Sequence, residues 1–234
     1  MPLQAGRTVT LPPEVAHHAL RVLRLRSGDE VVVFDGQGGE YSGRVAETAP
    51  TLRLALAEWR EVEREAPLAL TLAQALPSGD KMDWVVQKAV ELGVLAIQPL
   101  EAKRSVVRLV GERAEKRRVH WQQVAVAACE QSGRNRLPAI GPVLDLPHYL
   151  AQPAGENETR LLLAPQADTR LSALPRPVGG LTLLIGPEGG FDADEEAAAL
   201  SVGFHAVSMG PRVLRTETAG LAAIASILTL WGDF

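Results

Sequence analysis

Two glycine-bearing segments near the C-terminus carry residue types that could hold a small ligand. The first, Ile185-Gly186-Pro187-Glu188-Gly189-Gly190-Phe191, follows a short apolar run and precedes a helical pattern. Glycine lets the backbone approach a ligand closely and adopt positive φ. In open α/β sheets, ligands bind where such loops leave the carboxyl ends of strands. A plain strand-to-helix turn explains this one segment equally well.

The second segment, Met209–Gly220, adds charge to the same arrangement. It contains Arg212, Arg215 and Glu217, follows a predicted strand and opens a predicted helix. Its threonines could simply cap that helix. Helix capping does not account for the two arginines. They are two of only 5 basic residues in 141–234, a segment that also contains 11 acidic residues. This segment therefore favours a ligand site at the mouth of a sheet.

The elements around these segments alternate between strand and helix. Short apolar runs predict strands at Leu68–Leu76, Val94–Leu100, Leu161–Ala164, Leu181–Ile185 and His205–Met209. Helical spacing predicts helices at Lys81–Leu92, Glu112–Gln131, Asp192–Val202 and Thr216–Trp231, and Asp192 with Glu195 forms a capping box. Such alternation indicates an α/β fold with a mostly parallel sheet covered on both faces.

The N-terminal part has a different pattern, and it predicts a small barrel. Strands are expected at Arg7–Leu11, Glu30–Phe34, Tyr41–Ala46 and Thr51–Ala57. One helix is expected over Glu14–Leu25, with Val15, Ala19, Val22 and Leu23 on its apolar stripe. Gly36–Gly39 is expected to form a hairpin turn. The charged stretch Glu58–Glu65 is the best linker candidate, which divides the chain into domains 1–66 and 67–234.

Composition narrows the class of protein. The 234 residues are 46% hydrophobic and 22% charged, which is typical of a soluble globular protein. The single cysteine, Cys129, rules out an intramolecular disulfide, and no apolar run is long enough to span a membrane, so we expect a cytoplasmic protein without a membrane association. Net charge is −4, yet residues 71–140 carry +4, which could be a phosphate-facing surface or a solvated helix face.

The two segments together resemble the signature of the RsmE family. The resemblance rests on Gly186–Gly190 followed by Gly210, Arg212, Leu214, Arg215, Glu217, Thr218 and Ala219 in the family's spacing. It continues upstream through Lys81–Gly93, Lys103-Arg104-Ser105, Glu130–Arg134 and His17–Arg24. The similarity thus covers nearly the whole chain in the family's order. RsmE proteins are SPOUT-class enzymes that methylate N3 of a uridine in 16S ribosomal RNA.

The resemblance implies more than the patterns show. It implies a PUA-like, RNA-binding β-barrel at the N-terminus, a SPOUT catalytic domain with a C-terminal trefoil knot, and an obligate homodimer acting on 16S rRNA or the small ribosomal subunit. The implied cofactor is S-adenosyl-L-methionine. By resemblance, the cofactor-binding residues are Leu163, Ala164, Pro165, Ile185, Gly186, Pro187, Glu188, Gly189, Gly190, Met209, Gly210, Arg212, Val213, Leu214 and Thr216.

Methylation of N3 of uracil requires loss of a proton and stabilisation of negative charge on the ring carbonyls. Arg215 is expected to stabilise that charge, because its guanidinium offers a planar pair of donors. Glu217 is the nearest carboxylate that could take the proton. Favourable placement of an acid in the first turn of a helix explains Glu217 equally well, and water could also serve as the base.

For RNA binding, we expect Arg21, Arg24 and Arg26, which cluster around the end of the predicted N-terminal helix. Solvation of that helix is the alternative. A second possible surface consists of Lys103, Arg104, Arg108, Arg134 and Arg136 in the basic middle region. No residues stand at metal-ligand spacing, so no metal is expected. Alternative functions are a SPOUT enzyme acting on another RNA position and a non-catalytic rRNA-binding assembly factor.

Overall fold

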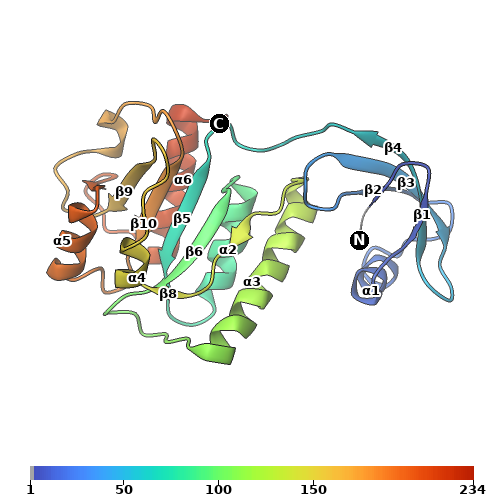
Figure 1. The fold of residues 1–234 in the computed structure, drawn as a ribbon, viewed down its shortest axis with the longest axis horizontal. Helices are drawn as coiled ribbons and strands as arrows, with labels where there is room; N and C mark the ends of the chain where they lie inside the picture. Colours follow the sequence, from blue (N-terminus) through green and yellow to red (C-terminus); the bar gives the residue numbers. More distant parts are fainter. Residues whose placement is uncertain (1–2) are drawn as a thin grey trace. The chain divides into compact units, whose positions relative to one another are not determined.

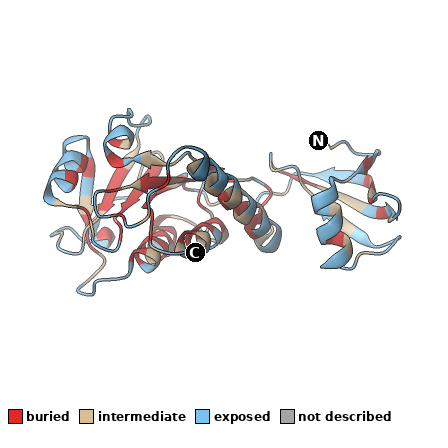
Figure 2. Cartoon of the chain, turned by 90° about the horizontal axis from the view of Figure 1, so that it is seen from below, coloured by how far each residue is buried: buried red, intermediate tan, exposed pale blue. Residues whose placement is uncertain are grey.

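The chain folds into two compact units, each with its own core (Figures 1 and 2). The computed structural model describes residues 3–234. The N-terminal unit consists of the chain up to Arg64 together with Gly133–Leu137, and the C-terminal unit consists of Glu65–Ser132 and Pro138–Phe234. The division falls two residues before the expected boundary. The membership of Gly133–Leu137 in the N-terminal unit was not anticipated.

The N-terminal unit is built on a four-stranded antiparallel sheet. Its strands are β1 (Thr8–Thr10), β2 (Glu30–Val33), β3 (Glu40–Glu47) and β4 (Arg53–Arg60), hydrogen-bonded in the order β1-β4-β3-β2. The expected hairpin turn at Gly36–Gly39 is confirmed. The expected linker was wrong at its start, because β4 continues to Arg60. There Trp59 pairs with Tyr41 across the strands, and Arg60 lies 3.1 Å from the buried carboxylate of Glu40.

Helix α1 (Pro13–Arg21) covers this sheet but is shorter than predicted. The prediction that it runs to Leu25 was wrong, because Arg24 adopts a left-handed φ of 57° and the Leu25 amide turns back to the Ala19 carbonyl. The predicted apolar stripe was also wrong in part. Ala16, Ala19 and Leu20 pack against the core, whereas Val15, Val22 and Leu23 are exposed.

The C-terminal unit confirms the predicted parallel α/β architecture. Its seven strands are β5 (Leu70–Ala75), β6 (Ala96–Glu101), β7 (Ala139–Ile140), β8 (Leu144–Asp145), β9 (Thr159–Leu163), β10 (Leu181–Ile185) and β11 (Phe204–Val207). The order is β11-β9-β10-β5-β6-β7, with β8 also on β6, and each pair is parallel. The sequence did not indicate β7 and β8, because two residues are too few to show periodicity.

Helices cover both faces of this sheet (Figure 1). They are α2 (Lys81–Glu91), α3 (Gly111–Ser132), α4 (Leu146–Leu150), α5 (Ala193–Ser201), α6 (Thr216–Trp231) and the short 3₁₀ helix η1 (Leu171–Ala173). Helix α2 packs on α3 and α6, whereas α5 packs on α4 and β11. The predicted capping box of α5 is confirmed, because Asp192 and Glu195 exchange hydrogen bonds between side chain and backbone.

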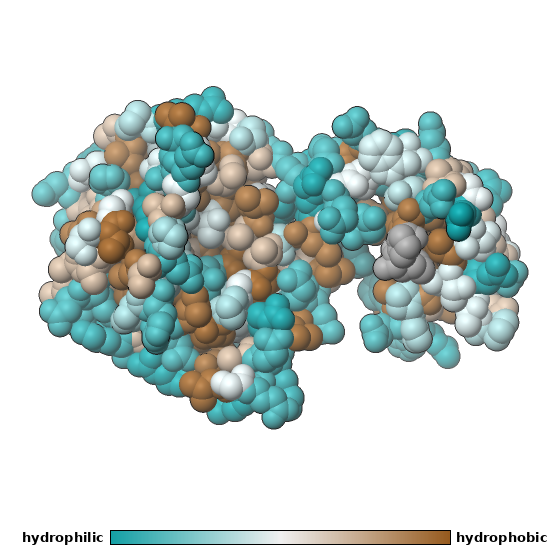
Figure 3. Space-filling view, in the orientation of Figure 1, coloured by the Kyte–Doolittle hydropathy of each residue, from teal (hydrophilic) through white to brown (hydrophobic). Residues whose placement is uncertain are grey.

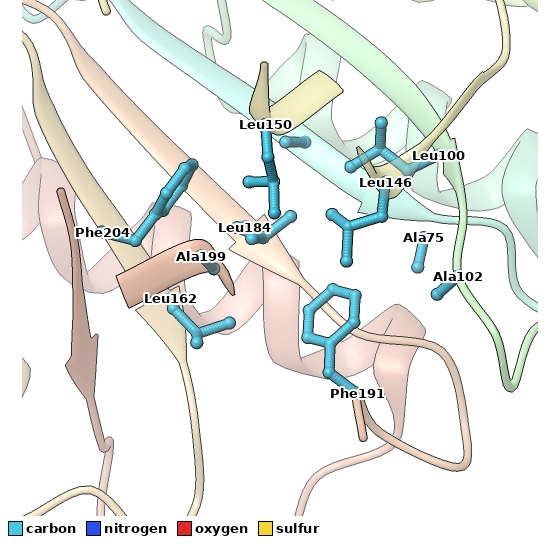
Figure 4. Close-up of a cluster of buried hydrophobic side chains, with 11 residues drawn as sticks. Ala75, Leu100, Ala102, Leu146, Leu150, Leu162, Leu184, Phe191, Ala199 and Phe204 are labelled. Carbon is cyan, nitrogen blue, oxygen red and sulfur yellow. The ribbon is translucent and has the colours of Figure 1, made fainter. Parts of the chain in front are cut away.

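An apolar cluster joins the sheet to α4 and α5 and ends under the first glycine loop (Figure 4). Strand residues such as Leu162 and Leu184 pack there with Leu146 of α4 and Ala199 of α5. Phe191, the last residue of the loop, is buried in the same cluster. Its burial anchors the loop to the core. Within residues 3–234, no helix is long and apolar enough to cross a membrane.

Candidate cofactor-binding site

A cavity of about 370 Å³ opens where β9, β10 and β11 end. Because these strands are parallel neighbours, the three loops that follow them meet at one edge of the sheet. The cavity is lined by Leu163, Pro165, Ile185, Gly186, Pro187, Glu188, Gly190, Met209, Gly210, Arg212, Val213, Leu214, Arg215 and Thr216. All of these were expected at the site from the sequence, so the structure brings the three segments together.

Two of the expected cofactor residues do not line the cavity. Ala164 donates its backbone amide to the Val207 carbonyl and thereby joins β9 to β11. Gly189 lies against Arg104, whose guanidinium donates to the Gly189 carbonyl at 2.8 Å. A Cβ built on Gly189 would stand 3.2 Å from the Arg104 side chain. A substitution there would therefore meet Arg104 rather than a ligand.

Two of the glycines that line the cavity, Gly190 and Gly210, have the conformation and the space that a ligand site needs. Gly190 has a φ of 67° and Gly210 a φ of 116°, values that L side chains rarely adopt. A Cβ built on either meets no atom within 4 Å. The space beside these two backbones is therefore open, as a close backbone approach to a ligand requires.

A buried hydrogen-bonded chain holds the cavity's loops in place. The Gln74 side-chain amide at the end of β5 donates to the Thr216 hydroxyl at 2.9 Å. The Thr216 hydroxyl in turn donates to the Gly186 carbonyl at 2.5 Å. Gln74 and Thr216 are both buried, so water cannot readily replace these bonds. The start of α6, the glycine loop and β5 are thus joined.

Ion pairs at the first turn of α2 join the same loops from another side. The Lys81 ammonium lies 3.2 Å from Oε1 of Glu188 and 3.4 Å from Oε1 of Glu217. Glu188 also accepts from the Ser78 amide at 2.8 Å and the Ser78 hydroxyl at 2.6 Å. Partial burial raises the pKa of Glu188, but the bonds from Ser78, its own amide and Lys81 outweigh this and lower the pKa to about 2.

The two residues expected to act in catalysis lie in different places. Arg215 lines the cavity, and its side chain is exposed at the N-terminus of α6. Glu217 does not line the cavity. One of its oxygens faces Lys81, and Oε2 is buried without a hydrogen-bond partner among the described residues.

Four further cavity residues were not anticipated as site residues, namely Lys81, Phe191, Glu196 and Ala219. Lys81 begins the helix after β5, a neighbour of β10, so the rule that ligands lie at the carboxyl ends of strands could have found it. Phe191 closes the first glycine segment. Ala219 belongs to the second segment and to the residues that carry the resemblance, although no ligand role was expected for it. Glu196 reaches the cavity through the packing of α5, and nothing in the sequence marks it.

The basic residues proposed for RNA binding differ in their surroundings. In the middle region, Lys103 pairs with Asp192 at 2.7 Å, Arg108 pairs with Glu101 at 3.5 Å, and Arg136 pairs with Glu63 at 2.9 Å. Arg104 is bonded to the glycine loop as described above, and Arg134 is buried, at 3% exposure.

By contrast, Arg21, Arg24 and Arg26 are exposed, and their guanidinium groups have no ion-pair partner within residues 3–234. Across the part of the chain that the structure describes, no three His, Cys, Asp or Glu residues are grouped so as to hold a metal ion.

Comparison with known proteins agrees with this architecture. An RNA methyltransferase domain family matches residues 64–228, and an RNA methyltransferase PUA domain family matches residues 11–52. The ribosomal RNA small subunit methyltransferase E of Buchnera aphidicola (subsp. Schizaphis graminum) is 32% identical over 99% of this chain and 94% of its own length. The Synechocystis protein of the same name is 34% identical, covering 95% of this chain and 73% of its own.

Two solved structures match the whole fold. A ribosomal RNA small subunit methyltransferase E from Neisseria gonorrhoeae, bound to S-adenosyl methionine, has a TM-score of 0.93 at 40% identity, with 100% of this chain and 96% of that one covered. A putative methyltransferase from Legionella pneumophila in complex with the same cofactor has a TM-score of 0.94 at 34% identity, with the same coverage. The chain therefore belongs to the family of PUA-containing RNA methyltransferases that includes the ribosomal RNA small subunit methyltransferase E proteins.

Proposed function

We propose that this protein transfers the methyl group of S-adenosylmethionine to N3 of a uridine in 16S ribosomal RNA of the small subunit. The observation that carries the proposal is the cavity formed by the three loops at the ends of β9, β10 and β11. It lies in a chain whose relatives are named small subunit rRNA methyltransferases, and similar structures hold this cofactor.

The cavity fits the cofactor in size and in chemistry. Its volume of about 370 Å³ lies within the range of small-ligand pockets. Leu163, Ile185 and Leu214 supply apolar lining, and the open glycine backbones supply amides and carbonyls at close range. Glu196 lines the cavity with no partner for its carboxylate among the described residues, so it could accept from an ammonium or a hydroxyl group. When bound, S-adenosylmethionine supplies an electrophilic methyl group.

Within this proposal, Arg215 stabilises the negative charge that develops on the uracil carbonyls as N3 loses its proton. Arg215 lines the cavity, and its guanidinium has no ion-pair partner among the residues that the structure describes. Both observations support this role, because a guanidinium free of other anions can donate to a substrate oxygen. For Glu217, the ion pair with Lys81 supports a positioning role rather than the removal of the proton. The Glu217 carboxylate on α6 holds the Lys81 ammonium of α2 in place.

We further propose that the N-terminal unit holds the RNA through Arg21, Arg24 and Arg26. Within residues 3–234 these cations have no anionic partner, whereas Lys103, Arg108 and Arg136 are already paired. Unpaired arginines are available to phosphates without first breaking an ion pair. An rRNA substrate also implies that the protein acts in the cytoplasm.

The trefoil knot and the homodimer stay predictions that rest on the family resemblance. The apolar surface of α6 is largely covered by the protein's own α2 and β10. It therefore adds no support for a dimer. Light scattering at low concentration tests the dimer, and a monomer that still methylates rRNA would contradict it.

The proposed reaction is tested by mass spectrometry of nucleosides from small subunit rRNA. A strain lacking the protein should lose 3-methyluridine, and the wild-type gene should restore it. Arg215→Ala should lower the rate about 10²–10³-fold, the loss expected for a donor that acts on developing charge. Arg176→Ala, which removes an exposed arginine outside the cavity lining, is the matched control. A methyl group on another base or on a ribose would contradict the proposal, as would unchanged rRNA in the deletion strain.

A further inference from the structure

The turn that ends α1 presents two neighbouring apolar side chains to solvent. Val22 is 62% exposed and Leu23 is 60% exposed. Single exposed apolar residues are common, and Figure 3 shows several scattered over both units. These two are adjacent in sequence, and Val15, one of the exposed residues of α1, lies seven positions before Val22 on the same side of the helix. The helical spacing predicted that Val15, Val22 and Leu23 lie on the apolar stripe of the helix, but in the structure all three are exposed.

Three cations surround this apolar pair. Arg21 precedes it and Arg24 follows it directly, and Arg26 lies two residues further on. All three are exposed, and none of their guanidinium groups forms an ion pair within residues 3–234. This turn therefore combines unpaired positive charge with exposed apolar surface in six consecutive residues. Neither feature contributes to the core of the unit.

The backbone directs these side chains into solvent through a conformation that is unfavourable for a residue other than glycine. Arg24 has a φ of 57°, the left-handed conformation in which a helix usually ends on glycine. The Leu25 amide bonds to the Ala19 carbonyl at 3.1 Å, and the Leu25 side chain packs against the core. The turn is thus anchored on both sides of Arg24. An arginine kept where glycine is preferred points to a use for its side chain.

We infer that this turn binds unpaired nucleotides of the RNA, with Val22 and Leu23 packed against exposed base faces and Arg21, Arg24 and Arg26 on the flanking phosphates. The inference rests on the proposed RNA methyltransferase function and names the form of RNA that the N-terminal unit selects. An A-form duplex stacks its bases inside and presents phosphates and hydroxyls, so it offers little to an apolar pair. Unpaired bases offer apolar faces beside phosphates.

A second copy of the chain, docked through the same turn, would fit this surface less well than RNA does. Two such turns placed against each other would bring three unpaired arginines on each side together, and like charges repel. RNA supplies the opposite charge and the apolar surface at the same time. A polyanion with unpaired bases therefore matches both properties of the turn.

The test compares two fluorescent RNA probes of equal nucleotide number, an unstructured oligouridylate and a fully paired hairpin, with the full-length protein. Val22→Ser combined with Leu23→Ser should weaken binding of the oligouridylate about tenfold. Binding of the hairpin should change less than about twofold, and the dependence of affinity on salt should be unchanged, because the variant keeps every charge. Arg21→Ala with Arg24→Ala should weaken both probes and lower the salt slope by about 0.7 for each phosphate of the single strand that the variant no longer neutralises.

Val32→Ser is the matched control. Val32 is 57% exposed in the same unit, but its strand neighbours Val31 and Val33 pack toward α1. Side chains alternate along a strand, so Val32 points to the opposite face of the sheet. This variant should bind both probes like wild type. Because all the substituted side chains are exposed, thermal unfolding should show wild-type stability for each variant.

Equal loss on both probes, or no loss on the oligouridylate, would overturn the inference. A change in oligomeric state on light scattering would overturn it as well and would identify Val22 and Leu23 as an interface between copies. These outcomes differ from failure of the proposed function. If the proposed function were wrong, the wild-type protein itself would bind no rRNA or transfer no methyl group.

Discussion

The hydroxyl of Thr216 donates a hydrogen bond of 2.5 Å to the carbonyl oxygen of Gly186. The two residues are 30 positions apart and belong to different cavity loops. The same hydroxyl accepts from the buried amide of Gln74, so it is satisfied as donor and as acceptor. One side chain therefore sets the distance between the loop after β10 and the start of α6, and with it the width of the cavity.

Thr216→Val should loosen this connection while keeping the shape of the side chain. The Gln74 amide and the Gly186 carbonyl would each lose a buried partner, which costs about 1–3 kcal/mol of stability. We expect a lower urea midpoint and weaker S-adenosylmethionine binding by calorimetry. Thr229→Val is the control, because Thr229 is exposed and its hydroxyl donates to the Ala225 carbonyl of its own helix. Cofactor affinity equal to that of wild type would show that the bond does not shape the cavity.

Lys81→Met should leave two carboxylates without their shared cation. Glu188 and Glu217 would face each other across the first turn of α2, and Glu217 is mostly buried, with 14% of its side chain exposed. We expect a loss of about 1–2 kcal/mol of stability and weaker cofactor binding, since Glu188 lines the cavity.

The control for this prediction is Lys88→Met on the same helix. Among the described residues, Lys88 pairs with Glu91 alone, three residues away, and it lies outside the cavity lining. It should keep cofactor affinity. Lys81→Arg should restore part of the affinity, because it retains the charge. If Lys81→Met and Lys88→Met bound the cofactor equally well, Lys81 would have no positioning role at the cavity.

Glu188 should make the folded protein sensitive to acid. Its pKa is lowered to about 2 from an ordinary value of 4.5, so the folded state binds a proton less readily than the unfolded state. The resulting stabilisation is complete above pH 4.5 and is lost as the pH falls toward about 2. The stability difference between wild type and Glu188→Gln should therefore be constant above pH 4.5 and shrink as the pH falls from 4.5 toward about 2 in urea titrations.

Glu112→Gln is the control for the acid dependence. Glu112 also pairs with a lysine, Lys116, but its side chain is 81% exposed. Surface pairs of this kind contribute little to stability, so this variant should follow wild type across the same pH range. A constant difference between wild type and Glu188→Gln at all pH values would contradict the role given to the Ser78 and Lys81 bonds.

The segment Gly133–Leu137 should be required for the N-terminal unit to fold. Asn135 is buried within this unit, its side chain donates to the Val62 carbonyl at 2.8 Å, and its carbonyl accepts from the Gly38 amide. Asn135→Ala would remove the first of these bonds and should destabilise the unit by about 1–3 kcal/mol. Hydrogen exchange should accelerate at the amides of residues 36–39. Gln123→Ala, at an exposed amide on α3, should leave this exchange unchanged.

A fragment of residues 1–66 tests the same dependence from the other side. The fragment lacks Asn135, and it also lacks Leu137, which donates its backbone amide to the Gly36 carbonyl. We expect the fragment to unfold without a cooperative transition. A stable, cooperative fragment would show that Gly133–Leu137 is an accessory rather than a part of this unit.

Local patterns were enough for most of the architecture. The capping box of α5, the glycine-rich turn before β3 and the alternation of strands with helices all depend on residues within a few positions of one another, and each was predicted. Two of the cavity loops were also found from their residues, because ligands bind where such loops leave the carboxyl ends of strands. The loop at Leu163–Pro165 came from the family resemblance. The resemblance added the cofactor and the substrate, which no periodicity could supply.

The sequence by itself determined the fold class, the two-part organisation and the glycine loops, since these follow from spacing along the chain. Only the tertiary structure decided what depends on contacts between distant segments. It brought Lys81 and Ser78 to Glu188 across more than 100 residues, turned Glu217 toward Lys81, and added Gly133–Leu137 to the N-terminal unit. It also ended α1 at Arg21, because burial of Leu25 and its bond to Ala19 outweigh the helical spacing that the sequence presents.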